Sequence, residues 1–251
     1  MSKKLAGTLF VCNGIKYDYC FMEAIQCLLD FCDHVFVCDA GSTDGTKDML
    51  LSINSPKITL IFRNDWDDYA GQEKLNFFTN IAIKRAEKEG YEYQFNLQAD
   101  ECVSERSYSS IRKAIDHGCE AYMCRRINLW EDCYHQLVVP LNRMPCSTSI
   151  IRLAKTYCRS VGDAESLGTS LVDTYYENSI AIWHYGFVRK KEVMKSKIIN
   201  MQCDVFGMEH YDQKLNDCEV FNPKLWFDGE DLAIIDSPHP KIMKEWIKDR
   251  P

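Results

Sequence analysis

Short apolar runs alternate with amphipathic stretches through the first half of the chain. The four runs are rich in β-branched and aromatic residues, which predicts buried strands. They lie at residues 6–12, 34–38, 58–62 and 93–97. The stretches between them have apolar residues at steps of three and four, which predicts helices. These helices are expected at residues 18–32, 44–53, 70–89 and 104–117. This alternation predicts an α/β fold with a mostly parallel sheet and helices on both faces.

The second half is less regular. Its short apolar runs predict a smaller antiparallel part, with strands at residues 121–129, 133–139 and 149–153. A further strand is expected at residues 180–184. Two further helices are expected, at residues 189–203 and 240–248. No stretch has the composition of a linker, so we predict a single domain over residues 1–251.

Composition narrows the class of protein. The 251 residues are 46% hydrophobic, which is enough for a sizeable core. The net charge of −7 argues against a general nucleic-acid coat. The 13 cysteines include no C-x-x-C pair and lie mostly in apolar runs, so we interpret them as reduced, buried thiols. The start of the chain lacks the apolar core of a signal peptide, and no apolar run is long enough to span a membrane. A cytoplasmic location is therefore expected.

Polar segments follow three of the predicted strands, where open parallel sheets bind ligands. Asn13 follows the first strand, residues 39–46 follow the second and residues 98–101 follow the fourth. Asp39 can accept hydrogen bonds from a ligand or can instead order its own turn. Asp100 and the adjacent Glu101 can hold a divalent cation or can form a solvated acidic turn.

These segments carry a family resemblance when they are taken together. The segment Val37-Cys38-Asp39-Ala40-Gly41-Ser42-Thr43-Asp44-Gly45-Thr46 resembles the second-strand signature of family 2 glycosyltransferases, which have the GT-A fold. Glu23-Ala24-Ile25 and Asp33 fit that family's N-terminal pattern. Leu97-Gln98-Ala99-Asp100-Glu101 falls where the family places its metal-binding D-x-D motif. The resemblance covers residues 6–105 and, more loosely, residues 145–205.

The resemblance implies a GT-A domain with three parts. A nucleotide-sugar-binding half is expected at residues 1–105, an acceptor-binding half at residues 106–205 and a C-terminal extension at residues 206–251. The implied reaction is inverting transfer of a sugar from a nucleotide diphosphate sugar, with UDP as the expected nucleotide and Mn²⁺ or Mg²⁺ as the expected cofactor. The Q-x-x-R-W signature of processive synthases is missing, so a single addition is expected.

The resemblance also assigns roles in the donor site. Asp39 would contact the nucleotide, and Asp100 would bind the metal that bridges the diphosphate. Gln98 stands where the family has the first Asp of the motif, which removes one anionic ligand and leaves Gln98 to reach the ribose or the sugar. The remaining residues expected at this site are Asn13, Ser42 and Ala99.

A second group of candidates lies outside the two motifs. His184, in Ile182-Trp183-His184-Tyr185-Gly186, matches the C-terminal histidine that GT-A enzymes often place on the metal; the alternative is a hydrogen-bonded core histidine. Arg189 opens a basic run that continues to Lys197, and it is expected beside the diphosphate, as is Lys74 more weakly. The alternative for the basic run is a solvated helix face.

Inverting transfer needs a carboxylate that takes the proton of the acceptor hydroxyl. In Ser160-Val161-Gly162-Asp163-Ala164-Glu165 we choose Asp163 as this base, with Glu165 second. The alternative for Asp163 is a helix cap. The expected acceptor is a cell-surface glycan precursor. A modified DNA base, a non-catalytic nucleotide- or sugar-binding module and a nucleotidyltransferase remain as alternatives.

Overall fold

The computed structural model describes residues 3–138, 147–169, 173–210, 212–216, 219–226 and 231–250. Its strands are β1 (Leu5–Val11), β2 (His34–Asp39), β3 (Ile58–Phe62), β4 (Tyr93–Asn96), β5 (Glu101–Val103), β6 (Ala121–Trp130), β7 (His135–Leu137), β8 (Ser149–Lys155), β9 (Arg159–Val161), β10 (Ser166–Gly168), β11 (Thr174–Phe187) and β12 (Leu232–Ile234). Its α-helices are α1 (Phe21–Phe31), α2 (Thr46–Leu51), α3 (Gln72–Lys88), α4 (Tyr108–His117) and α5 (Lys191–Asn200).

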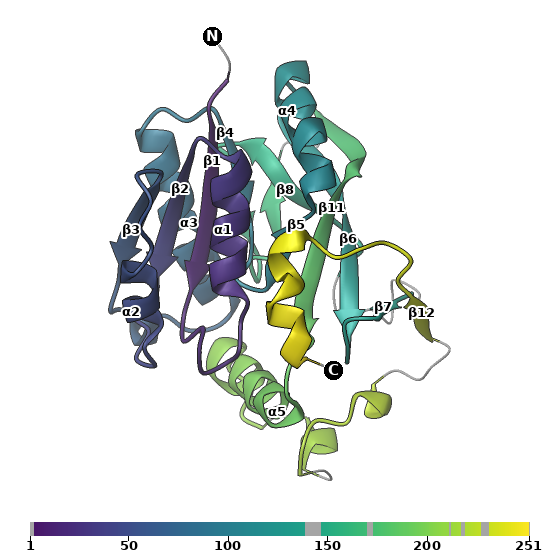
Figure 1. Ribbon diagram of the computed structural model, residues 1–251. Coiled ribbons are helices and arrows are strands. Elements are labelled where there is room, and N and C mark those ends of the chain that lie inside the picture. Colours follow the sequence, from purple (N-terminus) through teal and green to yellow (C-terminus); the bar gives the residue numbers. More distant parts are fainter. Residues whose placement is uncertain are drawn as a thin grey trace.

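The main sheet confirms the predicted fold class. Its order is β12-β7-β6-β8-β4-β1-β2-β3, and β11 pairs with both β5 and β6. The pairs that join β3, β2, β1 and β4 are parallel, whereas β8 is antiparallel to β4 and β6. Helix α1 covers one face of the parallel part and α3 covers the other (Figure 1). The carboxyl ends of β1 and β4 therefore lie at one edge of the sheet, beside α5.

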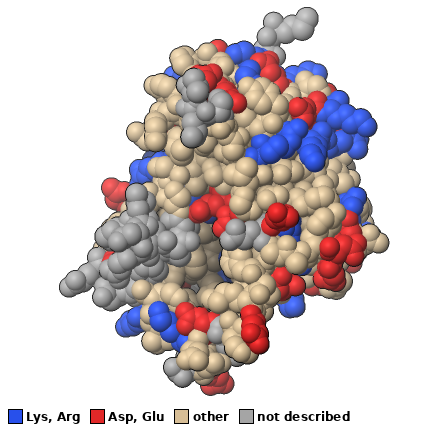
Figure 2. All heavy atoms as spheres, turned by 180° about the vertical axis from the view of Figure 1, so that it is seen from behind, with Lys and Arg blue, Asp and Glu red and all other residues tan. Residues whose placement is uncertain are grey.

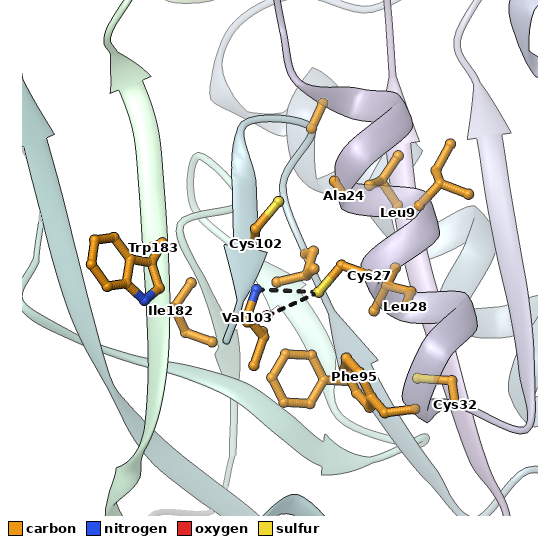
Figure 3. Close-up of a cluster of buried hydrophobic side chains, with 14 of the residues drawn as sticks. Leu9, Ala24, Cys27, Leu28, Cys32, Phe95, Cys102, Val103, Ile182 and Trp183 are labelled. Carbon is orange, nitrogen blue, oxygen red and sulfur yellow. Dashed lines mark hydrogen bonds between the residues drawn. The ribbon is translucent and has the colours of Figure 1, made fainter. Parts of the chain in front are cut away.

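The core beneath α1 shows how the chain uses its thiols. The side chain of Cys27 projects from α1 toward β5, and its Sγ accepts a hydrogen bond from the backbone N–H of Val103 at 3.2 Å (Figure 3). Cys102 and Cys32 lie in the same apolar cluster with Phe95. The described cysteines form no disulfide, and Cys146 and Cys218 lie outside the described residues. These thiols pack as small apolar side chains.

The second half departs from the prediction in three places. Strand β11 runs from Thr174 to Phe187, parallel to β6, although a strand was expected only at residues 180–184. The helix expected to end at Cys203 stops at Asn200 and continues as a π-helical turn, Met201–Val205. The last expected helix is instead a pair of 3₁₀ helices, Lys241–Lys244 and Trp246–Asp249. Among the described residues, no helix is both long enough and apolar enough to cross a membrane.

Candidate active site

A cavity of about 550 Å³ opens at the carboxyl ends of β1 and β4. Its walls come from the loop after β1, the turn after β4, the β9–β10 loop, the end of β11, and α5 with its π-helical turn. The candidate residues that line it are Asn13, Gln98, Ala99, Asp100, Asp163, Glu165 and His184. Residues from both halves of the chain thus meet in one cavity, which the sequence pattern alone did not establish.

Asp100 is the most strongly engaged carboxylate in this cavity. It is 6% exposed, and its Oδ2 lies 3.2 Å from Lys197 Nζ and 3.4 Å from a terminal nitrogen of Arg189. Its Oδ1 lies 3.8 Å from His184 Nε2. Burial alone would raise the pKa of Asp100, but the neighbouring groups, Lys197 foremost, outweigh burial and hold that pKa well below its usual range. Asp100 is therefore a carboxylate anion at neutral pH.

A hydrogen-bond chain sets the orientation of His184. The amide nitrogen of Asn128 donates to the carbonyl of Ser147 at 3.1 Å, so its oxygen faces His184 Nδ1 at 3.2 Å. Nδ1 then carries the proton, and the lone pair of Nε2 is directed to the side of Asp100. Burial, followed by the positive charge of Arg126, lowers the pKa of His184 well below its usual value. The ring is neutral and able to act as a ligand.

Glu101 orders the turn that holds Asp100. It is fully buried and accepts two hydrogen bonds from Arg152, at 2.8 and 2.9 Å. It also pairs with Arg126 at 2.9 Å and accepts the backbone N–H of Gln98 at 3.0 Å. Because both of its oxygens are bound by protein groups, Glu101 influences the site only by fixing the conformation of the turn.

Gln98 uses both ends of its side chain within the protein. Its Oε1 accepts from Arg126 at 2.8 Å, and its Nε2 donates to the carbonyl of Ala164 at 3.3 Å. An aspartate is shorter and lacks the amide donor, so it would lose the second contact. Gln98 therefore joins the turn after β4 to the loop that carries Asp163.

The loop with Asp163 and Glu165 is tightly held. Glu165 accepts from Arg126 at 2.9 Å and from the backbone N–H of Ser147 at 2.8 Å. The contact of Asp163 is local along the chain: its Oδ1 accepts the backbone N–H of Glu165, two residues later, at 3.2 Å. Helix α3 also holds this loop, because the side-chain amide of Asn76 donates a hydrogen bond to the carbonyl of Gly162 at 3.1 Å. Both carboxylates line the cavity, but Glu165 is the one engaged by an arginine.

The turn after β2 fixes the loop after β1. Ser42 Oγ accepts the N–H of Asn13 at 2.8 Å, and Asn13 Oδ1 accepts the N–H of Thr43 at 2.9 Å. Asp39 Oδ1 accepts the N–H of Ser42 at 3.0 Å, which is the turn-ordering role considered above. Gly41 has φ +97°, a conformation that side chains disfavour. Asn13 lines the cavity, whereas Asp39 and Ser42 are not among its lining residues.

The basic residues occupy two separate positions. Lys74 is 2% exposed, and its Nζ lies 4.6 Å from the ring centroid of Trp66 and 3.5 Å from Asp204. Arg189 is also buried and donates to the carbonyl of Tyr17 at 2.6 Å, so it anchors the loop after β1 as well as contacting Asp100. Neither side chain is among those that line the cavity, although Arg189 contacts Asp100, which does. The place expected for both residues beside a diphosphate stays a prediction.

Two cations of the site were not among the candidates. Arg126 bridges Gln98, Glu101 and Glu165, and it lies in a strand whose apolar pattern gave no sign of it. Lys197 belongs to the basic run that Arg189 opens, which was a signal available in the sequence. Burial and then Arg189 lower the pKa of Lys197 to about 8. It is thus a cation drawn into the cavity rather than part of a solvated face.

Comparison with known proteins adds a set of distant structures. No protein-family model matches the sequence, and no curated protein matches it either. The structure of S. aureus TarS, residues 1–349, is 14% identical and has a TM-score of 0.48, with 85% of this chain and 68% of that chain covered. Its complex with UDP has a TM-score of 0.46 over the same shares, at 14% identity.

A third similar structure is 4-diphosphocytidyl-2C-methyl-D-erythritol synthase from Anaerococcus prevotii. It is 11% identical, with a TM-score of 0.41 over 62% of this chain and 71% of that chain. At this distance, the description of the fold rests on the strand order of the chain itself. The parallel β3-β2-β1-β4 unit, continued by the antiparallel β8 and β6, gives the chain a fold of the GT-A type.

Proposed function

We propose that this chain is a glycosyltransferase that moves a sugar from a nucleotide diphosphate sugar, with UDP as the nucleotide, to an acceptor hydroxyl. One observation carries the proposal. The anionic Asp100, the neutral His184 and the carboxylate of Asp163 come from three distant segments and line a single cavity at the carboxyl edge of the sheet. Ligands of open α/β sheets bind at this edge.

The residues present fit a divalent cation, on the chemistry of their donor atoms. Asp100 Oδ1 and His184 Nε2 are 3.8 Å apart. A carboxylate oxygen suits Mn²⁺ or Mg²⁺, and the added imidazole nitrogen favours Mn²⁺ of the two. The described His, Cys, Asp and Glu residues form no group of three that could hold a metal. Cations of this kind are commonly held by one or two protein ligands together with substrate phosphates. A bound cation would neutralise charge on the diphosphate.

The chain's own residues divide the remaining work. Asp163 takes the proton of the acceptor hydroxyl as that oxygen attacks the anomeric carbon, and the bond from that carbon to the diphosphate oxygen breaks. Arg189 and Lys197 supply positive charge where the leaving diphosphate becomes more negative. Attack opposite to the leaving group inverts the anomeric centre. Arg126 holds Glu165 and Gln98 in place, so it positions the base loop.

The acceptor in this proposal is a glycan precursor. On the face shown in Figure 2, basic side chains form a large group at the upper right and a smaller one at the lower left, while acidic side chains lie near the centre, at the right and at the bottom. Together with the net charge of −7, this distribution disfavours an acceptor base in duplex DNA. Salt-sensitive retention of the protein on DNA would reverse that preference.

A thermal-shift panel tests the proposal directly. UDP, GDP, CDP and dTDP are each added with and without Mn²⁺, at about 100 times a typical dissociation constant, where binding adds about 2.7 kcal/mol of stability. We expect the largest shift with UDP plus Mn²⁺, and loss of the Mn²⁺ effect in Asp100→Asn. The matched control is Asp48→Asn on α2, which should respond as the unaltered chain does.

Three other outcomes would redirect the assignment. No shift with any nucleotide would overturn the donor site. A shift without sugar transfer or donor hydrolysis would indicate a non-catalytic nucleotide-binding module. Release of pyrophosphate, rather than a nucleoside diphosphate, would identify a nucleotidyltransferase.

A further inference from the structure

Lys197 reaches from α5 into the cavity and ends on the carboxylate of Asp100. Its Nζ donates to Asp100 Oδ2 at 3.2 Å and to the carbonyl of Gly186 at 3.0 Å. The side chain is 14% exposed and lines the cavity, and its Nζ lies 5.3 Å from the ring centroid of Tyr19. An ammonium group in such a place is held by few contacts and still borders the open space.

The two oxygens of Asp100 face different groups. Oδ2 faces Lys197 and Arg189, at 3.2 and 3.4 Å, whereas Oδ1 faces the neutral ring of His184. One carboxylate therefore carries two cations. Arg189 is fixed in addition by the carbonyl of Tyr17. The contacts of Lys197 with protein anions are confined, among the described residues, to Asp100.

The surrounding ion pairs do not cancel this excess. Glu101 is shared by Arg152 and Arg126, and Glu165 pairs with Arg126. Among these described groups, the cations are Arg126, Arg152, Arg189 and Lys197, and the carboxylates are Asp100, Glu101 and Glu165. None of the ion pairs of Glu101 and Glu165 involves Lys197 or Arg189, so at Asp100 two cations face one carboxylate. An anion that enters beside them can pair with either cation and offset this local excess of positive charge.

We propose that Lys197 is a diphosphate-binding residue whose place on Asp100 makes binding of the divalent cation depend on the donor. This inference rests on the proposed function and extends it to the order of binding. Without donor, the ammonium of Lys197 competes with Mn²⁺ for Asp100. When a diphosphate enters, Lys197 pairs with its oxygens, and the added negative charge favours Mn²⁺. Donor and metal then bind with positive coupling, which is reciprocal by thermodynamic necessity.

The test compares three variants in binding measurements that need no turnover. Lys197→Met removes the charge and keeps much of the length, and Lys197→Arg keeps the charge. Lys191→Met is the matched control on the same helix, because Lys191 is half-exposed and pairs at 3.3 Å with Glu131, away from Asp100. Titration calorimetry first measures the affinity for Mn²⁺ alone. It then measures the affinity for the nucleoside diphosphate that gives the largest thermal shift in the panel above, once in EDTA and once with Mn²⁺ present.

Opposite changes are expected for the two ligands. In Lys197→Met, Mn²⁺ alone should bind about tenfold more tightly, and the nucleotide in EDTA should bind about tenfold more weakly. The factor by which Mn²⁺ raises the nucleotide affinity should fall toward one. Lys197→Arg and Lys191→Met should stay within about twofold of the unaltered chain. Circular dichroism and the unfolding midpoint establish that Lys197→Met is folded.

Two results separate the failure of this inference from that of the proposed function. If Lys197→Met binds nucleotide and Mn²⁺ as the unaltered chain does, or binds both more weakly, Lys197 has no such role and the inference is overturned alone. If the unaltered chain binds none of the four nucleotides, the proposed function falls and this inference falls with it.

Discussion

The ring of His184 lies directly against Gly186, in the space where any other residue would place its Cβ atom. A Cβ built on Gly186 would overlap Nε2 and the adjacent carbon of the ring. The backbone of Gly186 is not in the left-handed region, so glycine is needed here for space and not for its conformation. The same residue accepts the hydrogen bond of Lys197, at 3.0 Å. Gly186 therefore contacts both the ring that faces Asp100 Oδ1 and the lysine that faces Asp100 Oδ2.

Gly186→Ala should displace the imidazole without unfolding the chain. The added methyl moves Nε2 away from Asp100, so the effect of Mn²⁺ on nucleotide affinity should fall by about 10- to 100-fold, the usual cost of disturbing a ligand's support. Calorimetry with UDP, with and without Mn²⁺, measures it. In a His184→Ala background the same change should add nothing, and a further loss there would show that Gly186 acts by another route.

Asp163→Asn should separate binding from transfer. The cavity-lining carboxylate is lost, so the transfer rate should fall by about 10²- to 10⁴-fold while nucleotide affinity stays within about twofold. Glu165→Gln should affect stability and nucleotide affinity as well, because Arg126 and Ser147 both hold that carboxylate. Transfer rates against pH measure the difference. A larger kinetic loss in Glu165→Gln, with binding intact, would make Glu165 the base.

Glu101→Gln should destabilise the whole chain. The change leaves Arg152 and Arg126 without their shared buried carboxylate, and breaking a buried pair in this way costs about 3–5 kcal/mol. Urea unfolding measures the loss. The control is Glu73→Gln at the exposed start of α3, which should stay within about 0.5 kcal/mol of the unaltered chain. A loss as small as that control's would mean that the arginines find water or other partners.

Acid should remove the contribution of Asp44. Burial raises the pKa of Asp44, but hydrogen bonds from the N–H of Lys16 and from Thr46 outweigh burial and place it below its ordinary 3.8. A carboxyl with a lowered pKa in the folded state stabilises fully above pH 3.8, and the gain disappears as the pH falls through the folded value. The stability difference from Asp44→Asn should thus be constant from pH 7 to 5 and shrink below pH 4. Urea unfolding across this range would contradict the account if the difference were independent of pH.

The sequence predicted the elements whose apolar period is clear and missed those that depend on distant partners. Strand β3 has the expected bounds, and α1 and α3 differ by a few residues at their ends. Strand β5 was not predicted because its burial depends on Arg152, which neutralises Glu101 from another strand. The first part of β11 includes Tyr176, which is 67% exposed, so no apolar alternation marks it as a strand.

The site followed the same rule. The motifs indicated Asp100 and His184, because each lies at the end of an apolar run. Their approach to 3.8 Å, and the place of Lys197 beside them, depend on how β11 and α5 cross the edge of the sheet. The spacing of residues along the chain carries no information about that crossing. The chemical roles assigned to these residues stay predictions.

The β1–α1 loop has a consequence for how the protein is assembled. Arg189 holds the carbonyl of Tyr17, and Arg250 donates to Asp18 at 2.6 Å across a sequence separation of 232 residues. Contacts between such distant positions form slowly, because the chain must first lose the entropy of a very long loop. We therefore expect the cavity to be completed late in folding, after both halves have docked. Recovery of nucleotide binding during refolding should lag behind recovery of helical signal, which would make the ligand a reporter of the final docking step.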